Sequence, residues 1–213
     1  MTAPRGKFIS LEGGEGAGKS TLLAGVRSVL ESRGIHVVQT REPGGTPVGE
    51  AVRAIVLDPT MHGLAAETEL LLMFASRAQL VREVIEPSLT AGQWILCDRY
   101  ADASHAYQGG GRGQPSSRIA ELERWACAGV KPDLTLLLDV PVATGRARVA
   151  GRGDADRIES EADAFFERVR ANYRERAALE PGRFRLIDAS QPPAVVLRSA
   201  TSVLTSWLAE SAA

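Results

Sequence analysis

A glycine-rich segment near the N-terminus constrains this chain more than any other feature. Residues 13–20 read GGEGAGKS, with the apolar run FISLE before them and a helical pattern beginning TLLAGVRSVL after them. They fit the pattern G-x-x-x-x-G-K-[ST], with Gly13, Gly18, Lys19 and Ser20 at the fixed positions. Glycines allow successive backbone N–H groups to turn toward one anion, and the helix that follows adds its positive N-terminal dipole. The segment therefore predicts a strand–loop–helix unit that cradles the phosphates of a nucleoside triphosphate.

Two polar side chains of this segment can contact the triphosphate and its metal ion. The Lys19 ammonium can reach the β- and γ-phosphates, and the Ser20 hydroxyl can bind Mg²⁺. The residues expected to bind ATP, several of them through backbone N–H groups, are Gly13, Gly14, Glu15, Gly16, Ala17, Gly18, Lys19, Ser20 and Thr21.

Short apolar runs alternate with longer helical patterns along the whole chain of 213 residues. The runs are apolar on both faces, as buried parallel strands are, and occupy residues 7–11, 36–40, 94–98, 134–139 and 184–188. The helical patterns occupy about residues 19–33, 48–57, 65–86, 116–128, 142–150, 160–180 and 192–209. Pro87 is expected to end the third of these helices. The alternation predicts one α/β domain, a five-stranded parallel sheet with helices on both faces, that binds ligands at the carboxyl edge of its strands.

Two segments rich in glycine and charge, residues 107–117 and 151–160, fall near this predicted edge. They are interpreted either as mobile loops over a site or as plain surface loops.

Composition excludes several classes of protein. The formal net charge is −1, so no overall field attracts nucleic acid or an anionic membrane. No apolar run reaches membrane-spanning length, and no signal-peptide pattern is present. Cys97 and Cys127 fit no metal-ligand spacing and are expected to be reduced core residues. We therefore expect a cytoplasmic protein that binds neither nucleic acid nor membranes.

Arginines stand beside the predicted strand ends. Arg41 follows the second strand, and Asp98 and Arg99 close the third. Guanidinium groups match phosphate oxygens and keep their charge, so they predict a second phosphate-bearing substrate beside the triphosphate. Asp98 is placed to hold Mg²⁺ or to orient its waters, although a buried aspartate capping a turn is the alternative. No N-K-x-D motif for reading guanine is present, which disfavours a GTPase.

Taken together, the motifs resemble those of bacterial thymidylate kinases. FISLEGGEGAGKSTL, TREPGGTPVGE, LLMFASRAQLV, CDRYADASHAYQGGGRG, KPDLTLLLDV and GRGDADRIE occur in this order. The resemblance covers about residues 6–209. It implies a P-loop kinase fold with a short mobile lid at about residues 142–160, and a homodimer. It also implies Mg²⁺-dependent phosphoryl transfer from ATP to dTMP, giving dTDP and ADP in dTTP biosynthesis.

The resemblance assigns the sugar and phosphate of dTMP to four residues. Glu15 resembles the carboxylate that contacts the 3′-hydroxyl group. Arg41 and Arg99 resemble the pair that grips the dTMP phosphate. Asp98 resembles the carboxylate at the catalytic edge.

The resemblance also implies which residues meet the thymine base. Phe74 resembles the aromatic ring that stacks on thymine, and Arg77, on the same helix face, resembles the arginine that reaches the base edge. Ser104 and Gln108 stand where family members read polar atoms of thymine. Tyr107 resembles the ring that crowds C2′ of the sugar and disfavours ribonucleotides.

Gly16 stands where some members of this family carry an arginine. The arginine that neutralises the transferring phosphoryl group is therefore expected from the lid, where Arg152 occupies the matching position. Arg148 is interpreted as packing against adenine or contacting phosphate. Arg157 is interpreted as an ion-pair partner of a glutamate within residues 159–161.

Three other functions stay open at this point. The chain could be a kinase of another pyrimidine nucleoside monophosphate, a P-loop module that binds nucleotide without turnover, or a DNA-handling ATPase. Lys19, Ser20 and Asp98 argue against lost activity, and the short length and lack of net positive charge argue against the ATPase. The apolar helices at 48–57 and 65–86 suit either a dimer interface or packing against the sheet.

Overall fold

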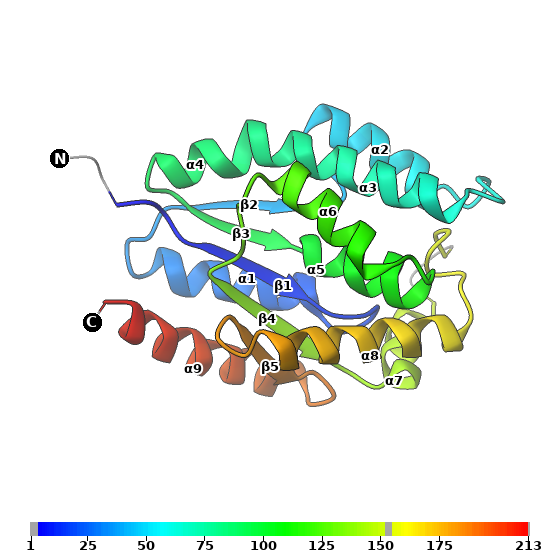
Figure 1. Cartoon of the computed structure of the whole chain (residues 1–213). Helices are drawn as coiled ribbons and strands as arrows, with labels where there is room; N and C mark the ends of the chain where they lie inside the picture. The colour runs from blue at the N-terminus through cyan, green and yellow to red at the C-terminus, as the bar shows by residue number, and fades with distance from the viewer. Residues whose placement is uncertain (1–3, 152–154, 213) are drawn as a thin grey trace.

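In the computed structural model, which describes residues 4–151 and 155–212, five parallel strands form one sheet with helices on both faces (Figure 1). The strands are β1 Phe8–Glu12, β2 Val37–Arg41, β3 Trp94–Asp98, β4 Leu134–Asp139 and β5 Phe184–Asp188. Their order in the sheet is β2-β3-β1-β4-β5. The predicted α/β sheet is confirmed.

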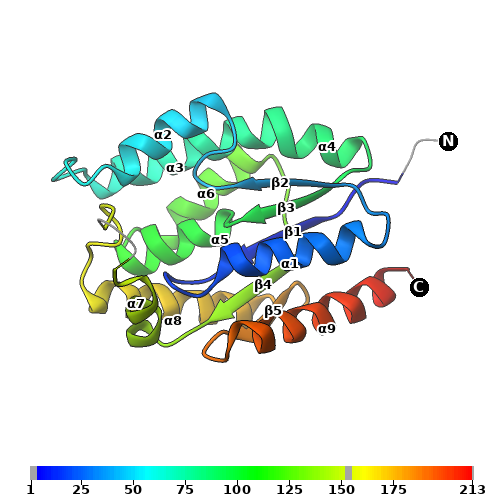
Figure 2. The same cartoon turned by 180° about the vertical axis from the view of Figure 1, so that it is seen from behind.

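The helical segments follow the predicted order, and three short segments, at residues 86–90, 101–104 and 105–111, extend or add to those predicted. The helical segments are α1 Lys19–Glu31, α2 Pro47–Leu57, α3 Ala66–Leu80, η1 Val81–Ile85, α4 Glu86–Thr90, α5 Ala101–Ser104, η2 His105–Gly111, α6 Ser116–Cys127, α7 Val142–Val149, α8 Asp163–Leu179 and α9 Pro193–Ala212. Helices α1 and α9 cover the face of the sheet seen in Figure 2, and α4, α6 and α8 lie over the opposite face seen in Figure 1. Within the described residues, no helix combines the length and the apolar character that crossing a membrane requires.

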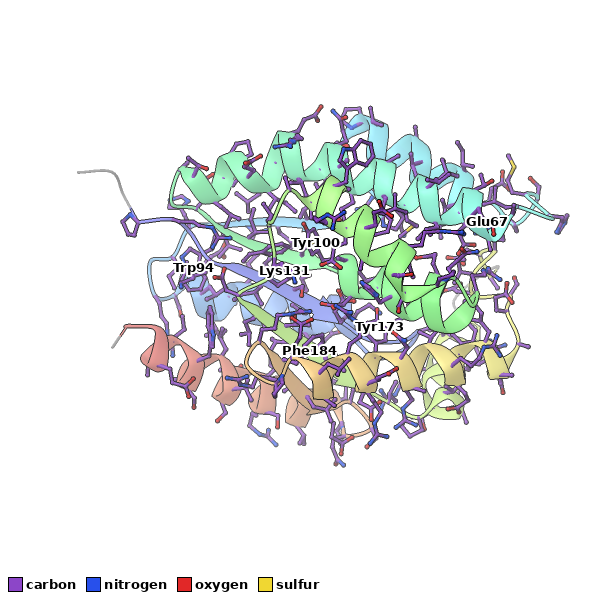
Figure 3. All side chains as sticks on the ribbon, viewed as in Figure 1. Glu67, Trp94, Tyr100, Lys131, Tyr173 and Phe184 are labelled. Atoms are coloured by element: carbon purple, nitrogen blue, oxygen red, sulfur yellow. The ribbon has the colours of Figure 1, made fainter. Side chains whose placement is uncertain are left out.

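The core lies on both sides of the central strands. Every residue of β1 is buried, and Ile9 and Leu11 pack among apolar side chains of α1 and α9. On the other side, Tyr100 and Tyr173, labelled in Figure 3, are buried between the sheet and its covering helices. The prediction that all strands are apolar on both faces is wrong for β2 and β5, which are partly exposed because they form the edges of the sheet.

Strand register brings the predicted site residues to one edge. Leu11 of β1 pairs with Asp98 of β3, and Asp98 pairs with Arg41 of β2. The glycine-rich loop after β1 therefore leaves the sheet beside the Asp98–Arg99 step and Arg41. The strand order also changes direction at β1, which is where open parallel sheets bind ligands.

Pro87 does not end the third predicted helix. The helical backbone runs through α3, the wider π-helical turn η1, and α4, in which Pro87 is the second residue. A proline inside an α-helix clashes with the carbonyl group four residues earlier. The wider turn immediately before Pro87 relieves that crowding and lets the helix continue to Thr90.

The first part of segment 107–117 is helical rather than loop. The π-helical η2 packs on α8, and its glycines make the close approach possible. A Cβ atom at Gly110 would lie 2.8 Å from the carbonyl oxygen of Arg168, and one at Gly111 would lie 2.4 Å from the ring of Phe165. The glycines that suggested a loop are therefore packing positions.

Candidate active site

A cavity of about 790 Å³ opens at the carboxyl ends of β1, β2 and β3. It is lined by residues 15–21 of the glycine-rich loop and α1, by Arg41, Asp98 and Arg99 at the strand ends, and by part of α7. Sequence reasoning predicted this edge of the sheet as the ligand site, and the predicted phosphate-binding groups meet there.

The glycine-rich loop is held against α7 by close backbone packing. Gly16 has a left-handed φ of 68°, and a Cβ atom there would lie 2.0 Å from the carbonyl oxygen of Gly145. Gly18 precedes α1 with a φ of 90°, also in the region that glycine favours. The loop can therefore present backbone N–H groups at the start of α1, where the helix dipole is positive.

Lys19 is buried inside this loop. Its Nζ donates hydrogen bonds to the carbonyl oxygens of Gly13 and Gly14, both at 3.0 Å. Burial, followed by the positive charge of Arg99, lowers the pKa of Lys19. The ammonium group is thus fixed beside the cavity, with its present acceptors on the loop itself.

Glu15, Arg99 and Tyr107 form a hydrogen-bonded cluster on the cavity wall. Arg99 Nη2 and the Tyr107 hydroxyl donate to Glu15 Oε1 at 2.6 and 2.9 Å, and Arg99 Nη1 donates to the Tyr107 oxygen at 2.9 Å. Burial alone would raise the pKa of Glu15, but the charges of Arg99 and Lys19 and the two hydrogen bonds lower it to about 2. Glu15 is therefore an ionised acceptor at neutral pH.

The backbone of Arg99 is unusual for a residue with a side chain. Its φ of 68° places it in the left-handed region immediately after β3 ends. Such backbone strain is uncommon outside glycine and clusters at functional sites. Here it accompanies a guanidinium group that meets the glycine-rich loop, donating to the carbonyl oxygen of Gly13 at 3.1 Å.

Arg41 lies on the open side of the cavity. Its Nη2 donates to both carboxylate oxygens of Glu50, at 2.9 and 2.8 Å, and the pair is exposed. Sequence reasoning missed Arg53 of α2, which also lines the cavity and donates to the carbonyl oxygen of Pro43. A lone arginine within the apolar run AVRAIVL was the available signal.

Asp98 and Ser20 both line the cavity, and they suit a divalent cation. Asp98 Oδ1 is buried and has no hydrogen-bond partner among the described residues. An unpartnered buried carboxylate oxygen needs an external partner. Carboxylate, hydroxyl and phosphate oxygens are the ligands that Mg²⁺ takes, so these residues fit the ion that the sequence predicted.

Phe74, Arg77 and Ser104 come together, but they are buried beside the cavity rather than on its surface. Arg77 donates to Glu42 Oε2 at 2.8 Å and to Ser104 Oγ at 3.0 Å, and its guanidinium carbon lies 4.5 Å from the ring centre of Phe74. The described residues that line the cavity on this side include Met73, Tyr107 and Gln108. Met73 was not predicted.

The predicted lid arginines differ in what they contact. Arg152 lies outside the described residues. Arg148 donates to the carbonyl oxygens of Ala189 and Ser190, at 2.7 and 3.1 Å. The predicted ion pair of Arg157 with a glutamate within residues 159–161 is wrong, because its guanidinium group reaches across to α3 and pairs with Glu69 Oε2 at 2.6 Å.

The chain is similar to known proteins in both sequence and fold. A family model described as thymidylate kinase matches residues 11–200. The thymidylate kinase of Alkalilimnicola ehrlichii is 54% identical over 209 residues, covering 96% of each chain. That of Bordetella pertussis is 52% identical over 209 residues, covering 98% of this chain and 99% of its own. A crystal structure of thymidylate kinase from Ehrlichia chaffeensis matches with a TM-score of 0.78 at 31% identity, over 94% of this chain and 100% of that one.

Proposed function

Because this chain belongs to the thymidylate kinase family, we infer that it transfers a phosphoryl group from ATP to dTMP, giving dTDP and ADP. One observation carries the inference at the level of the site. The glycine-rich loop with Lys19 and the guanidinium groups of Arg41 and Arg99 line a single cavity. A triphosphate and a second phosphate can therefore share one space, as direct transfer between them requires.

In the proposed reaction, the protein aligns the two substrates and compensates the negative charge of their phosphates. The loop N–H groups and Lys19 hold the ATP phosphates, with Lys19 exchanging its loop carbonyl acceptors for phosphate oxygens. Arg41 and Arg99 aim the dTMP phosphate at the γ-phosphorus. Glu15, ionised and held by Arg99 and Tyr107, accepts a hydrogen bond from the 3′-hydroxyl group.

We propose that Ser20 and Asp98 hold Mg²⁺ beside the ATP phosphates. The support is the buried, unpartnered Oδ1 of Asp98 in the cavity that Ser20 also lines. When bound, the ion would neutralise charge on the phosphate oxygens. In this proposal Ser20 contributes its hydroxyl oxygen and Asp98 a carboxylate oxygen, and both oxygens face the ATP phosphates.

The thymine base is proposed to meet the side of the cavity formed by α3 and η2. Phe74 stacks on the base, Arg77 and Ser104 reach its edge, Gln108 reads a polar atom, and Tyr107 crowds C2′ of the sugar. Tyr107 and Gln108 line the cavity on this side, and Phe74, Arg77 and Ser104 are buried beside it. Arg77 is hydrogen-bonded to Ser104, and this grouping supports the assignment.

Residues 1–213 are proposed to act as a single nucleoside monophosphate kinase domain with a lid at about residues 142–160. Arg152 would neutralise the transferring phosphoryl group when the lid closes, and Arg148 would contact ATP. Because an arginine in that role accelerates transfer strongly, Arg152→Ala is expected to lower kcat about 10³-fold. Near-normal turnover of this variant would exclude the role.

A homodimer in the cytoplasm is the proposed state of the protein. Exposed apolar side chains on α2 and α3 support an interface between copies, namely Val48, Ile55 and Leu71. Both free cysteines, Cys97 and Cys127, are buried thiols, which suits a reducing compartment.

A coupled assay of ADP release tests the function. MgATP is supplied with one acceptor at a time: dTMP, dUMP, UMP, dCMP, AMP, GMP or none. Strong preference for dTMP with little background hydrolysis is expected. Equal use of UMP or dCMP would contradict the base-reading roles, and hydrolysis independent of acceptor would contradict the kinase itself.

A further inference from the structure

Glu69, near the start of α3, is a buried carboxylate to which the proposed mechanism gives no task. Its side chain is 0% exposed and lies among three donors. Gln108 Nε2 donates to Oε1 at 2.9 Å, and Arg157 Nη2 and Arg112 Nε donate to Oε2 at 2.6 and 3.2 Å. Three segments that are distant in sequence therefore meet at one carboxylate.

This carboxylate determines which way the amide of Gln108 faces. Burial would raise the pKa of Glu69, but hydrogen bonds from Gln108 and Arg157 and the charges of Arg112 and Arg157 together lower it. Glu69 is therefore ionised at neutral pH and can only accept hydrogen bonds. Gln108 must turn its NH₂ group toward Glu69 and its carbonyl oxygen away.

The carbonyl oxygen of Gln108 is left in need of a partner. Gln108 lines the cavity, and its Oε1 is buried with no hydrogen-bond partner among the described residues. Leaving a buried acceptor unsatisfied is costly, so a ligand that brings a donor to this oxygen gains affinity. An amide free to rotate would lack this selectivity, because it could present either a donor or an acceptor.

We propose that Glu69 is a positioning residue for base selection, because it holds the Gln108 amide so that only an acceptor faces the base. Thymine has a single ring donor, N3–H, whereas cytosine has a bare acceptor at N3 and its donor on the C4 amino group. A fixed acceptor at N3 therefore favours thymine over cytosine. This inference rests on the proposed function and adds a determinant of its substrate class.

The test compares kcat/KM for dTMP and dCMP in wild type and in Glu69→Gln. The new amide can donate or accept, so Gln108 becomes free to turn its NH₂ group toward the base. The ratio of kcat/KM for dTMP to kcat/KM for dCMP is expected to fall about tenfold or more, because one hydrogen bond that discriminates between the two bases is lost.

A double-mutant cycle tests whether Glu69 acts through the Gln108 amide or only by holding Arg112 and Arg157 in place. Gln108→Met removes the amide, and in that background Glu69→Gln is expected to leave the ratio unchanged. Glu69→Asp keeps an acceptor-only group and is expected to retain more of the ratio than Glu69→Gln. An equal fall of the ratio with and without Gln108, or an unchanged ratio in Glu69→Gln, would overturn the proposal.

The chain offers a matched control two residues away. Glu67, labelled in Figure 3, is exposed on the same helix and accepts a hydrogen bond from Gln114 Nε2 at 3.1 Å. Neither Glu67 nor Gln114 is among the described residues that line the cavity. Glu67→Gln thus makes the same chemical change to a glutamate–glutamine pair and should keep the wild-type ratio.

Two further readouts keep the result interpretable. Wild-type turnover of dTMP tests the proposed function by itself, so a failure there is separate from a failure of Glu69→Gln to alter selection. If Glu69→Gln does not fold, wild type is assayed with N3-methyl-dTMP, which lacks the donor. Relative to dTMP, kcat/KM for N3-methyl-dTMP is expected to be lower by at least about tenfold in wild type. The loss should be smaller in Gln108→Met. Equal use of the two nucleotides by wild type would overturn the proposal.

Discussion

Two glutamates three residues apart hold opposite protonation states, and their neighbours explain the difference. Glu15 lies against Arg99 and Lys19, which lower its pKa to about 2. Glu12 ends β1 inside the core, where burial and then the charge of Asp102 raise its pKa to about 8. Glu12 accepts a hydrogen bond from the Tyr100 N–H group and bonds the Tyr173 hydroxyl group, so it serves the fold rather than the phosphates.

The raised pKa of Glu12 predicts how stability depends on pH. Folded Glu12 keeps its proton up to about pH 8, whereas the unfolded chain loses it near 4.5. Between these values the folded state binds more protons, so this group's contribution to stability falls as pH rises. Glu12→Gln removes that dependence. Its free energy of unfolding, measured in urea, should rise relative to wild type from about pH 5 to about pH 8.

The control for this measurement is Glu210→Gln, which changes an exposed glutamate on α9. Its difference from wild type should stay constant with pH. An equally constant difference for Glu12→Gln would mean that Glu12 is ionised in the folded protein.

Single residues of the site were predictable where a motif or a strand end identified them. Lys19, Asp98, Arg41 and Arg99 meet at the cavity because parallel strands share a carboxyl edge. Glu69 was missed because its proposed role depends on contacts between three segments that are distant in sequence. No spacing in the sequence indicates such a meeting.

At the scale of elements, the sequence predicted strands well and helix ends less well. The strands 94–98, 134–139 and 184–188 have the bounds that the structure shows. The continuation through Pro87 depends on a widened turn, and the helical η2 depends on glycines packed against α8. Both are outcomes of tertiary packing that override local signals.

The contact between α7 and the glycine-rich loop is predicted to support ATP binding. A Cβ atom at Gly145 would lie 2.3 Å from the carbonyl oxygen of Glu15. Alanine is favoured over glycine inside a helix by about 1 kcal/mol, so α7 alone would gain from Gly145→Ala. We expect the clash to outweigh that gain, lowering the melting temperature and raising the KM for ATP about tenfold.

Gly182→Ala is the matched control, because a Cβ atom there would meet nothing within 4 Å. It should leave the KM for ATP unchanged. If Gly145→Ala behaved in the same way, the packing of α7 would not set the shape of the loop.

At the scale of the whole molecule, the predicted single α/β domain accounts for the position of the site. The strand order reverses at β1, and the three strands that end there carry the groups that we propose bind both phosphates. Sequence alone could not decide between core packing and an interface for α2 and α3, because apolar residues serve both. The structure buries one face of each helix and leaves Val48, Ile55 and Leu71 exposed.

Sedimentation equilibrium tests the proposed homodimer. Wild type is expected at twice the chain mass of 22.7 kDa. Leu71→Asp is expected at the mass of one chain with little change in melting temperature, because Leu71 is 57% exposed. Leu179→Asp, on α8, changes a leucine that is 73% exposed and should stay dimeric. Wild type at the mass of one chain would contradict the dimer.

The most direct test follows the phosphoryl group itself. The protein is incubated with dTMP, Mg²⁺ and ATP labelled at its γ-phosphate, and the labelled product is identified by chromatography. The label should appear in dTDP only when dTMP is present, and Lys19→Ala should lower its rate of formation about 10²-fold or more. Release of the label as inorganic phosphate, whether or not dTMP is present, would contradict transfer between two nucleotides in one cavity.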